Sequence, residues 1–403
     1  MAQALLRQLA FVATGTTHFT QAGYEKARRA PWWEQTHRCL EGDRPLRGKL
    51  VAITGANAGL GAAVAEGVAR LGATTLLLCR SLERGRAAAD AIKQRDPQAV
   101  VEVEQVDVSS LASIAAFAAR FCGGGGGKGG KDAASSSSSS SSAARPLHCL
   151  VNNAGILPHE RRLVEPEGFE SSFATNVAGT MALTLALKPA LLRAAQEAAA
   201  ASAANGGGGA SSGEAAATSI PRVVFVSSGG MYTDPLRIDI PLDPHDASAP
   251  ATTPPFNGVR AYSRDKRRQV ALAEALGRRW ARDGILVASY HPGWADTPGV
   301  QTALPAFRAK FEGKLRQPEG GADTAVWMAA APAGLGGGGG GGGSDDASVL
   351  APGEFYLDRR PQPKHLLGAS GRVAGTSYTP ADADLLLERV VGLLKEKGAT
   401  VAV

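Results

Sequence analysis

Short apolar runs alternate with longer amphipathic stretches along the chain from residue 48 onward. A run of four to eight apolar residues between turn residues indicates a buried strand, and apolar residues three or four apart indicate a helix. The strand-length runs cover residues 50–54, 74–79, 100–106, 147–152, 222–228 and 285–290. The helical stretches cover residues 59–71, 82–95, 109–121, 169–198 and 259–282. This alternation predicts an α/β fold class with a doubly wound parallel sheet and helices on both of its faces.

The C-terminal part of the chain continues this pattern. Residues 353–357 form one more strand-length run, and residues 380–396 have helical spacing. The hydroxyl of Thr379 can accept a hydrogen bond from an N–H group of the first turn of this helix. Pro380 fits the first helical position, where a missing N–H group costs nothing. We therefore expect a single domain over residues 48–397.

Three stretches, near residues 122–144, 194–219 and 332–348, consist almost entirely of Gly, Ser or Ala. Each falls between two predicted elements and interrupts none of the core runs. Such tracts bury nothing that offsets their ordering entropy, and lengthening a flexible loop costs little. We expect low-complexity insertions at the surface of the one domain; a lid or a linker is the alternative.

Residues 1–47 form a leader before the first strand. Residues 1–24 contain one arginine and no Asp or Glu, and Leu5, Leu6, Leu9 and Val12 have roughly helical spacing. One interpretation is an amphipathic helix that packs on the domain or makes peripheral contact with a membrane surface. The other is an organellar transit peptide, which is also poor in acidic residues. We expect a cytoplasmic protein, with organellar targeting as the alternative.

Charge and cysteine content exclude several classes of protein. The net charge is only +6, which implies no nucleic-acid partner. The four cysteines show no CxxC pair and no metal-ligand spacing, so we expect neither a disulfide framework nor a metal site. The chain contains no run of 18 apolar residues, the length that a membrane-spanning helix requires.

A glycine-rich segment, TGANAGLG, joins the first strand to the first helix. Glycines allow the sharp turn and let the backbone approach a pyrophosphate, which then meets unpaired N–H groups at the positive end of the helix dipole. The context of strand before and helix after makes this a strong signal for a Rossmann-type dinucleotide site. The residues that we assign to cofactor binding here are Thr54, Gly55, Asn57, Gly59, Leu60 and Gly61.

The second and third strands end in polar residues that bear on the choice of cofactor. Many NAD-binding units carry an acidic residue after the second strand, but this chain has Arg80, whose guanidinium suits a 2′-phosphate. An exposed arginine that opens the next helix is the alternative. Asp107 and Val108 follow the third strand, within reach of an adenine ring. We expect NADP(H) as the preferred cofactor, with NAD(H) as the alternative.

A second group of residues suits proton transfer. The strand at residues 222–228 ends in Ser227 and Ser228, and the next helix carries Tyr262 and Lys266 four positions apart, hence on one face. A tyrosine has a pKa of about 10, which a neighbouring ammonium lowers. Such a tyrosine can donate a proton to a carbonyl oxygen, or take one from an alcohol, while a serine hydroxyl holds that oxygen.

Together with NNAG (152–155), FATNVAG (173–179) and HPGWADT (291–297), these motifs resemble the short-chain dehydrogenase/reductase family over residues 48–360. The resemblance implies that Tyr262 is the acid/base, that Lys266 also binds the ribose, and that Ser228 holds the substrate oxygen. It implies that Asn176 keeps a proton-relay water in place. The further positions that it assigns to cofactor binding are Asn153, Ala154, Gly155, Pro292, Gly293 and Thr297. Tyr262 lies 34 positions after Ser228, whereas many family members have a much shorter gap, and the intervening segment therefore leaves the shape of the substrate pocket open.

The resulting hypothesis is an NAD(P)(H)-dependent oxidoreductase that transfers a hydride between nicotinamide and a small-molecule carbonyl or alcohol. Ligand pockets are mostly apolar, so we expect a lipophilic substrate. One alternative is an NADP-binding regulatory or scaffold protein of the same fold, which the intact set of four catalytic residue types disfavours. A methyltransferase lacks the two motifs, and an epimerase would carry a larger C-terminal substrate domain. The sequence names neither the substrate nor the oligomeric state.

Overall fold

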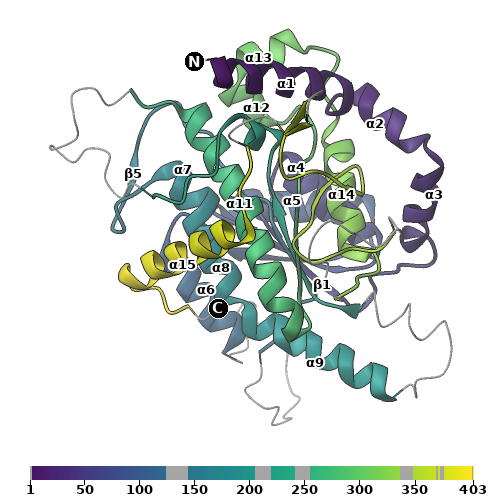
Figure 1. The fold of residues 1–403 in the computed structure, drawn as a ribbon. Coiled ribbons are helices and arrows are strands. Elements are labelled where there is room, and N and C mark those ends of the chain that lie inside the picture. Colours follow the sequence, from purple (N-terminus) through teal and green to yellow (C-terminus); the bar gives the residue numbers. More distant parts are fainter. Residues whose placement is uncertain are drawn as a thin grey trace.

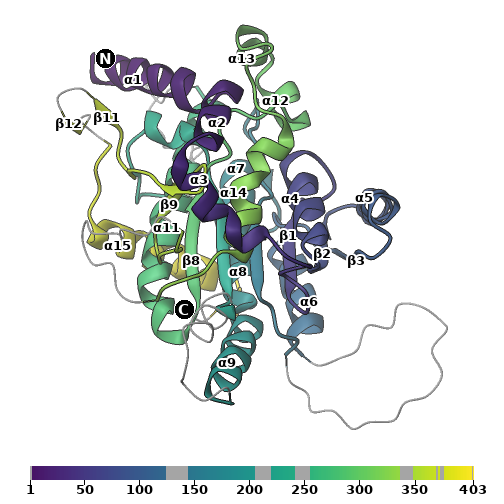
Figure 2. The same ribbon diagram turned by 90° about the vertical axis from the view of Figure 1, so that its right-hand side faces the viewer.

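The fold was taken from a computed structural model, which describes residues 2–123, 144–204, 219–240, 255–335, 348–368, 371–372, 376–401 and 403. Most of each low-complexity stretch lies outside these residues, and so does part of the segment between Ser228 and Tyr262. The expectation that the tracts are surface insertions therefore stays a prediction. The described residues form a central sheet with a layer of helices on each face (Figure 1; Figure 2).

The sheet has eight strands in the order β10-β9-β8-β7-β4-β1-β2-β3. All pairings are parallel except that of β10, which runs antiparallel to β9. The strands are β1 (Leu50–Thr54), β2 (Thr74–Cys79), β3 (Val100–Gln105), β4 (Cys149–Asn152), β7 (Arg222–Val226), β8 (Leu286–Tyr290), β9 (Phe355–Leu357) and β10 (Arg360–Pro361). The predicted doubly wound parallel sheet is confirmed, and each strand predicted from an apolar run begins and ends within about two residues of its predicted bounds.

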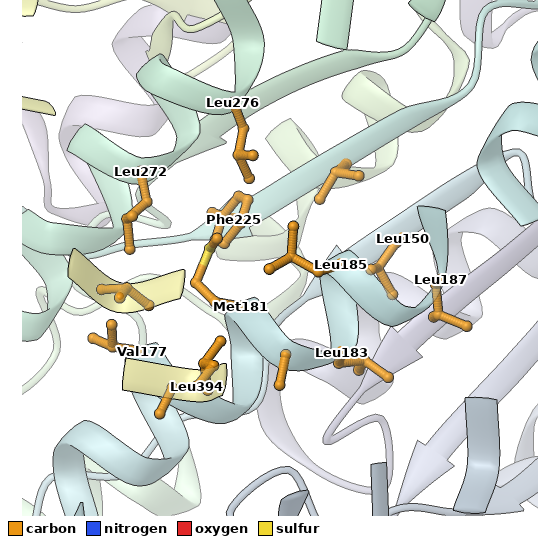
Figure 3. Close-up of a cluster of buried hydrophobic side chains, with 14 of the residues drawn as sticks. Leu150, Val177, Met181, Leu183, Leu185, Leu187, Phe225, Leu272, Leu276 and Leu394 are labelled. Atoms are coloured by element: carbon orange, nitrogen blue, oxygen red, sulfur yellow. The ribbon is translucent and has the colours of Figure 1, made fainter. Parts of the chain in front are cut away.

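Two layers of helices bury the two faces of the sheet. One face is covered by α4 (Gly59–Arg70), α5 (Leu82–Arg95) and α14 (Pro318–Ala330). The other is covered by α6 (Leu111–Cys122), α8 (Thr180–Ala186), α9 (Lys188–Ala204), α11 (Gly258–Trp280) and α15 (Pro380–Glu396). On this second face Met181, Phe225 and Leu272 meet between sheet and helices (Figure 3). This core fixes α11, which carries the candidate catalytic residues.

The helix predicted over residues 169–198 is wrong as one continuous element. The chain there forms β6 (Phe169–Glu170), α7 (Ser171–Phe173), a π-helix η2 (Ala174–Gly179), α8 and α9. At the end of η2, a Cβ atom on Gly179 would lie 1.5 Å from the carbonyl oxygen of Val108, so the backbones approach more closely than any side chain allows. The second low-complexity tract was also predicted too long, because residues 194–204 continue α9. Alanine, which dominates them, has the highest helix propensity.

The predicted start of the C-terminal helix is confirmed. The Thr379 hydroxyl accepts a hydrogen bond from the backbone N–H of Asp382, and the Asp382 carboxylate accepts one from the backbone N–H of Thr379. Pro380 occupies the first helical position. The remaining short elements are η1 (Arg38–Leu40), β5 (Leu163–Val164), η3 (Gly229–Thr233), η4 (Ala281–Asp283), α12 (Pro298–Ala303), α13 (Pro305–Lys310), β11 (Leu367–Gly368) and β12 (Gly371–Arg372).

The N-terminal segment forms α1 (Ala2–His18), α2 (Gln21–Arg28) and α3 (Pro31–His37), and it packs along the domain (Figure 1). The buried guanidinium of Arg316 holds the α1–α2 junction. It donates hydrogen bonds to the carbonyls of His18 at 2.6 Å, Phe19 at 3.0 Å and Thr20 at 3.3 Å. It also makes a two-pronged ion pair with Asp358. The structure therefore shows the leader packed on the domain, as one form of the first interpretation has it, and organellar targeting stays a prediction.

The inner face of α1 lies over η3, the turn that follows Ser228. A Cβ atom on Gly15 would lie 2.1 Å from the ring of Trp294, and one on Gly229 would lie 2.8 Å from the ring of Phe19. The outer face leaves Leu5, Leu6 and Leu9 about 60% exposed, so the expected contact with a membrane surface stays a prediction. Among the described residues no single helix is long and apolar enough to cross a membrane; the bent pair of residues 171–186 and 188–204 passes that test only when the two are counted together.

Candidate active site

The site lies where the strand order reverses. β1 pairs with β2 on one side and with β4 on the other, so the connections after β1 and β4 leave the sheet in opposite directions. Ligands of open α/β sheets bind in the crevice at the carboxyl ends of the strands at such a point. The candidate cofactor residues Thr54–Gly61 and Asn153–Gly155 follow these two strands.

The backbone of the glycine loop has the shape of a phosphate cradle. Gly55 and Gly59 have φ values of +64° and +54°, which few other residues adopt. A Cβ atom on Gly61 would lie 2.4 Å from the carbonyl oxygen of Gly55, so only glycine fits there. Ala58, the N-cap residue of α4, makes no side-chain hydrogen bond, which leaves the first N–H groups of the helix open to an anion. These features fit the pyrophosphate of a dinucleotide.

Hydrogen bonds of Thr54 and Asn153 hold the glycine loop against the segment that follows β4. The Thr54 hydroxyl accepts hydrogen bonds from the backbone N–H groups of Asn153 and Ala154, both at 2.9 Å. The Asn153 amide donates to the carbonyls of Thr54 at 2.9 Å and Gly55 at 3.4 Å. The structure therefore brings the TGANAGLG and NNAG motifs together, with Asn153 as a support for the glycine loop.

Other predicted cofactor residues surround this loop in different ways. A Cβ atom on Gly59 would lie 3.3 Å from Cβ of Thr297, whose hydroxyl caps α12. The side chains of Leu60 and Pro292 both face Gly321 of α14. The backbone of Asn57 hydrogen-bonds the sulfur of Cys79. Thus Thr297 borders the loop, whereas the side chain of Leu60 serves packing.

Gly293 occupies a different environment from the one expected. Its φ is +71°, and a Cβ atom there would lie 2.3 Å from Nε of Arg316 and 2.7 Å from the carbonyl oxygen of Phe19. Position 293 therefore needs a glycine because Arg316 and the N-terminal segment pack directly against it. Its predicted contact with the nicotinamide stays a prediction.

A pocket of about 290 Å³ lies where β2 and β3 end, at the place where the sequence predicts the adenosine of the cofactor. Arg80 and Asp107 line it together with Gln105, Ser113, Ala116 and Arg120, which sequence analysis did not single out. The predicted contacts of Arg80 and Asp107 with a cofactor stay a prediction. The Gln105 amide donates to the carbonyl of Arg80 at 3.1 Å, and the Arg80 side chain is exposed. The carboxylate of Asp107 accepts hydrogen bonds from the backbone and hydroxyl of Ser109 at 2.9 and 2.6 Å, and so shapes the turn.

The predicted proton-transfer residues come together at the carboxyl end of β7. The Ser228 side chain hydrogen-bonds Tyr262, which lowers the pKa of the phenol, but burial raises that pKa more, to about 12. Ser228 also caps η3 by accepting from the backbone N–H of Gly230 at 3.2 Å. The ammonium of Lys266 lies 5.4 Å from the centre of the Tyr262 ring. In the chain alone, therefore, Lys266 does not bring the pKa of Tyr262 below its ordinary value.

Lys266 is buried, with 3% of its surface exposed. Its ammonium donates hydrogen bonds to the carbonyl of Val226 at 2.7 Å and to the side-chain oxygen of Gln269 at 3.1 Å. A Cβ atom on Gly155 would lie 3.3 Å from Nζ, so this glycine leaves room for the ammonium. Burial lowers the pKa of Lys266 to about 8, against the opposing effect of Asp265.

Asn176 joins the same group from the π-helix η2, a type of distortion that is frequent at functional sites. Its side-chain amide donates to the carbonyl of Ile156 and its side-chain oxygen accepts from the N–H of the same residue, both at 2.9 Å. Its own carbonyl accepts a hydrogen bond from the amide of Gln269 at 2.7 Å. Sequence analysis missed Gln269, although its place one turn beyond Lys266 on the same face of α11 could have pointed to it.

Comparisons with known proteins agree with this geometry. The family model described as short chain dehydrogenase matches residues 49–123. A cattle relative, dehydrogenase/reductase SDR family member 12 from Bos taurus, is 32% identical over 386 residues, which cover 95% of this chain and 96% of the relative. The chain therefore belongs to the short-chain dehydrogenase/reductase family, as its motifs predicted.

Two further proteins are similar over a smaller share or at a lower identity. Retinol dehydrogenase 12 from Mus musculus is 34% identical over 250 residues, which cover 62% of each protein. A crystal structure of a protein from Mycobacterium paratuberculosis superimposes with a TM-score of 0.52 at 24% identity, covering 87% of this chain and 94% of that one. The mouse protein is an oxidoreductase by its name, and the Mycobacterium structure supports the fold.

Proposed function

We propose that the protein is an NADP(H)-preferring oxidoreductase that reduces a carbonyl group, or oxidises the corresponding alcohol, through Ser228, Tyr262 and Lys266. The observation that carries the proposal is the meeting of these three side chains at the carboxyl end of β7, next to the glycine loop. A nicotinamide cofactor, when bound, supplies or accepts the hydride. Thr54–Gly61 and Asn153–Gly155 would hold it, because their backbones form the cradle described above.

The side chains then perform the proton half of the reaction. In reduction, the Tyr262 hydroxyl gives its proton to the carbonyl oxygen as that oxygen gains an electron pair. Ser228 holds the same oxygen, and the Lys266 ammonium stabilises the phenolate that remains. Because burial raises the pKa of Tyr262 to about 12, the phenol is protonated at neutral pH. This is the form that can donate a proton when a carbonyl is reduced.

We propose a lipophilic substrate. Close to Ser228 lies an apolar cluster in which the rings of Phe11, Trp294, Phe307 and Phe311 contact one another. A Cβ atom on Gly229 would lie 3.3 Å from the ring of Phe11, one residue from Ser228. An apolar wall of this kind favours substrates with a hydrocarbon body. The name of the similar mouse protein, retinol dehydrogenase 12, agrees with such a substrate.

The preference for NADP(H) rests on the exposed guanidinium of Arg80 at the adenosine pocket. A charge-assisted hydrogen bond to a 2′-phosphate is worth about 1.5–3 kcal/mol, or roughly a factor of 10 to 150 in affinity. Arg80→Asp should weaken NADPH binding by that factor and improve NADH relative to it, as measured by titration calorimetry. Equal affinity of the unaltered protein for both cofactors would contradict the preference.

The activity itself is tested by incubating the purified protein with NADPH against aldehydes, ketones, steroid ketones and retinal, and with NADP⁺ against the corresponding alcohols. The absorbance of the reduced cofactor reports turnover. The proposal predicts that NADPH is oxidised only when a carbonyl compound is present, and faster with hydrophobic compounds. If the protein binds NADPH but turns over none of them, the regulatory or scaffold alternative replaces the proposal.

A further inference from the structure

We infer that Gln269 is a positioning residue that holds the ammonium of Lys266 in place and couples it to the main-chain carbonyl of Asn176. The inference rests on the proposed role of Lys266 in the reaction. It names a residue that neither the glycine motif nor the Tyr-Lys pair contains. Two hydrogen bonds in the buried interior carry it.

Gln269 lies on the same face of α11 as Tyr262 and Lys266. Tyr262, Lys266 and Gln269 lie at positions i, i+4 and i+7, so they share one face of the helix. Gln269 is fully buried on this face. A buried amide must find partners for both its oxygen and its nitrogen, and here each partner belongs to a predicted catalytic residue.

The two ends of the Gln269 amide bind different residues. Its oxygen accepts a hydrogen bond from Nζ of Lys266 at 3.1 Å, and its nitrogen donates to the carbonyl oxygen of Asn176 at 2.7 Å. A carboxamide is a bridge of fixed polarity, since it offers an acceptor to the cation and a donor to the carbonyl. The side chain therefore couples the α11 lysine directly to the π-helix that carries Asn176.

The bridge from Lys266 through Gln269 to Asn176 bears on the role that the sequence predicts for Asn176. The resemblance to the family implied that Asn176 keeps a proton-relay water in place. In this chain the Gln269 amide is a donor to the Asn176 carbonyl. Gln269 thus occupies the position between Lys266 and that carbonyl with a side chain that cannot take up and pass on a proton at neutral pH.

The surroundings make Lys266 sensitive to this one partner. Two of its three N–H groups are used, one by Gln269 and one by the Val226 carbonyl. Asp265, the carboxylate next to it in sequence, is bonded by the Ser172 hydroxyl at 2.7 Å and by the Arg268 guanidinium at 2.9 Å. Among the described residues, the ammonium therefore donates to two neutral oxygens, and its third N–H group is left for the proposed contacts with Tyr262 and the ribose.

Within the part of the chain that the structure describes, few titratable groups lie around Lys266. On its own helix, Tyr262 faces it with the ring centre 5.4 Å away, and Asp265 raises its pKa. The elements packed against it are β7, η2 and the turn after β4. They present the Val226 carbonyl, Asn176 and Gly155, none of which titrates. A change at position 269 thus alters one of the two hydrogen bonds that the ammonium donates to Val226 and Gln269.

The test measures the pKa of Lys266 directly, in the full chain without cofactor, by NMR of protein labelled with ¹³C at the lysine Cε atoms. Lys266→Met assigns the signal. The unaltered protein should titrate near 8 at this position. Gln269→Leu removes the acceptor and keeps the volume, so the pKa should fall by about one to two units, because a hydrogen bond to a charged group is lost. Gln269→Glu places a carboxylate at the same distance and should raise the pKa by at least as much.

A matched control separates positioning from stability. Thr184 is also fully buried, and its hydroxyl donates to the carbonyl of Thr180 and accepts from the Asn152 amide, both at 2.8 Å; in the described part of the chain neither of these hydrogen bonds involves Lys266. Thr184→Val should lower the melting temperature as Gln269→Leu does, yet leave the Lys266 titration unchanged. If both Gln269 variants also leave that titration unchanged, Gln269 is a packing residue and the inference is wrong.

The same variants, loaded with NADPH and assayed on any carbonyl compound that the screen identifies, give a second readout. The pH at which turnover falls on the alkaline side should move down in Gln269→Leu and up in Gln269→Glu, in step with the NMR pKa. Failure to find a turned-over substrate would count against the proposed function alone, because the NMR titration judges the bridge without turnover. Matching pKa shifts with an unmoved turnover profile would contradict the coupling of Gln269 to the reaction.

Discussion

Replacing Arg316 by methionine should release the N-terminal segment from the domain. The guanidinium is 1% exposed and holds both oxygens of Asp358 together with the carbonyls of His18, Phe19 and Thr20. Removing one partner of a buried ion pair costs about 3–5 kcal/mol, because the other charge stays buried without compensation. A domain has only about 5–15 kcal/mol of stability in total, so the loss should be large.

Urea unfolding measures the loss, and limited trypsin digestion locates it. Arg316→Met should lower the free energy of unfolding by about 3–5 kcal/mol. It should also speed cleavage after Lys26, Arg28 and Arg29, which lie in or directly after α2. The double variant Arg316→Met with Asp358→Asn should recover part of the loss, since no charge is then left buried. Asn also tolerates the φ of +50° at position 358.

Arg308→Met is the matched control. Arg308 pairs with Asp296 in a similar forked geometry, but the two side chains are 45% and 26% exposed. Exposed pairs are worth at most about 1 kcal/mol, so this variant should stay close to the unaltered protein. A loss below about 1 kcal/mol for Arg316→Met, with unchanged digestion, would refute the idea that Arg316 fastens the segment.

Three further predictions address the site and its pH dependence. Gly61→Ala should weaken NADPH binding more than about tenfold and destabilise the chain by about 1–3 kcal/mol, because the new Cβ atom would lie 2.4 Å from the Gly55 carbonyl oxygen. Titration calorimetry measures the binding and urea unfolding the stability. As the control, Gly392→Ala should be neutral or stabilising, because a Cβ atom there meets nothing within 4 Å. Ser228→Ala should slow single-turnover reduction by about 10²-fold or more with NADPH affinity retained, and a change below about threefold would contradict its role. Burial lowers the pKa of His291 to about 3, below its unfolded value of 6.5. Between pH 7 and pH 5, His291 therefore takes up a proton in the unfolded chain but not in the folded chain, and the free energy of unfolding should fall by about 2 kcal/mol. In urea unfolding, His291→Gln should lose this part of the pH dependence.

The sequence was most informative where a residue acts through its neighbours along the chain. Parallel strands buried on both faces are continuous apolar runs, so the strands could be located within about two residues. The glycine loop could be located for the same reason, because the turn and the close approach depend on glycines a few positions apart. The capping of the last helix by Thr379 is equally local.

Features that depend on contacts distant in the chain could not be predicted in this way. The Gln269 amide bonds a carbonyl 93 positions away, and Arg316 bonds Phe19 at a separation of 297 positions. The helix α14 was missed because its small residues and glycines, PEGGADTAVWMAA, give almost no apolar periodicity. The leader could not be placed because its aromatic residues pack against Trp294, a contact that the leader sequence alone does not specify.

The central claim is that Tyr262 transfers the proton while the cofactor transfers the hydride. Single-turnover reduction of a carbonyl compound by protein preloaded with NADPH tests it most directly, with Tyr262→Phe compared against the unaltered chain. The substitution removes the hydroxyl and little volume, so NADPH should still bind with nearly unchanged affinity. The account predicts that hydride transfer nearly stops in the variant. Hydride transfer at the full rate in Tyr262→Phe would contradict the account.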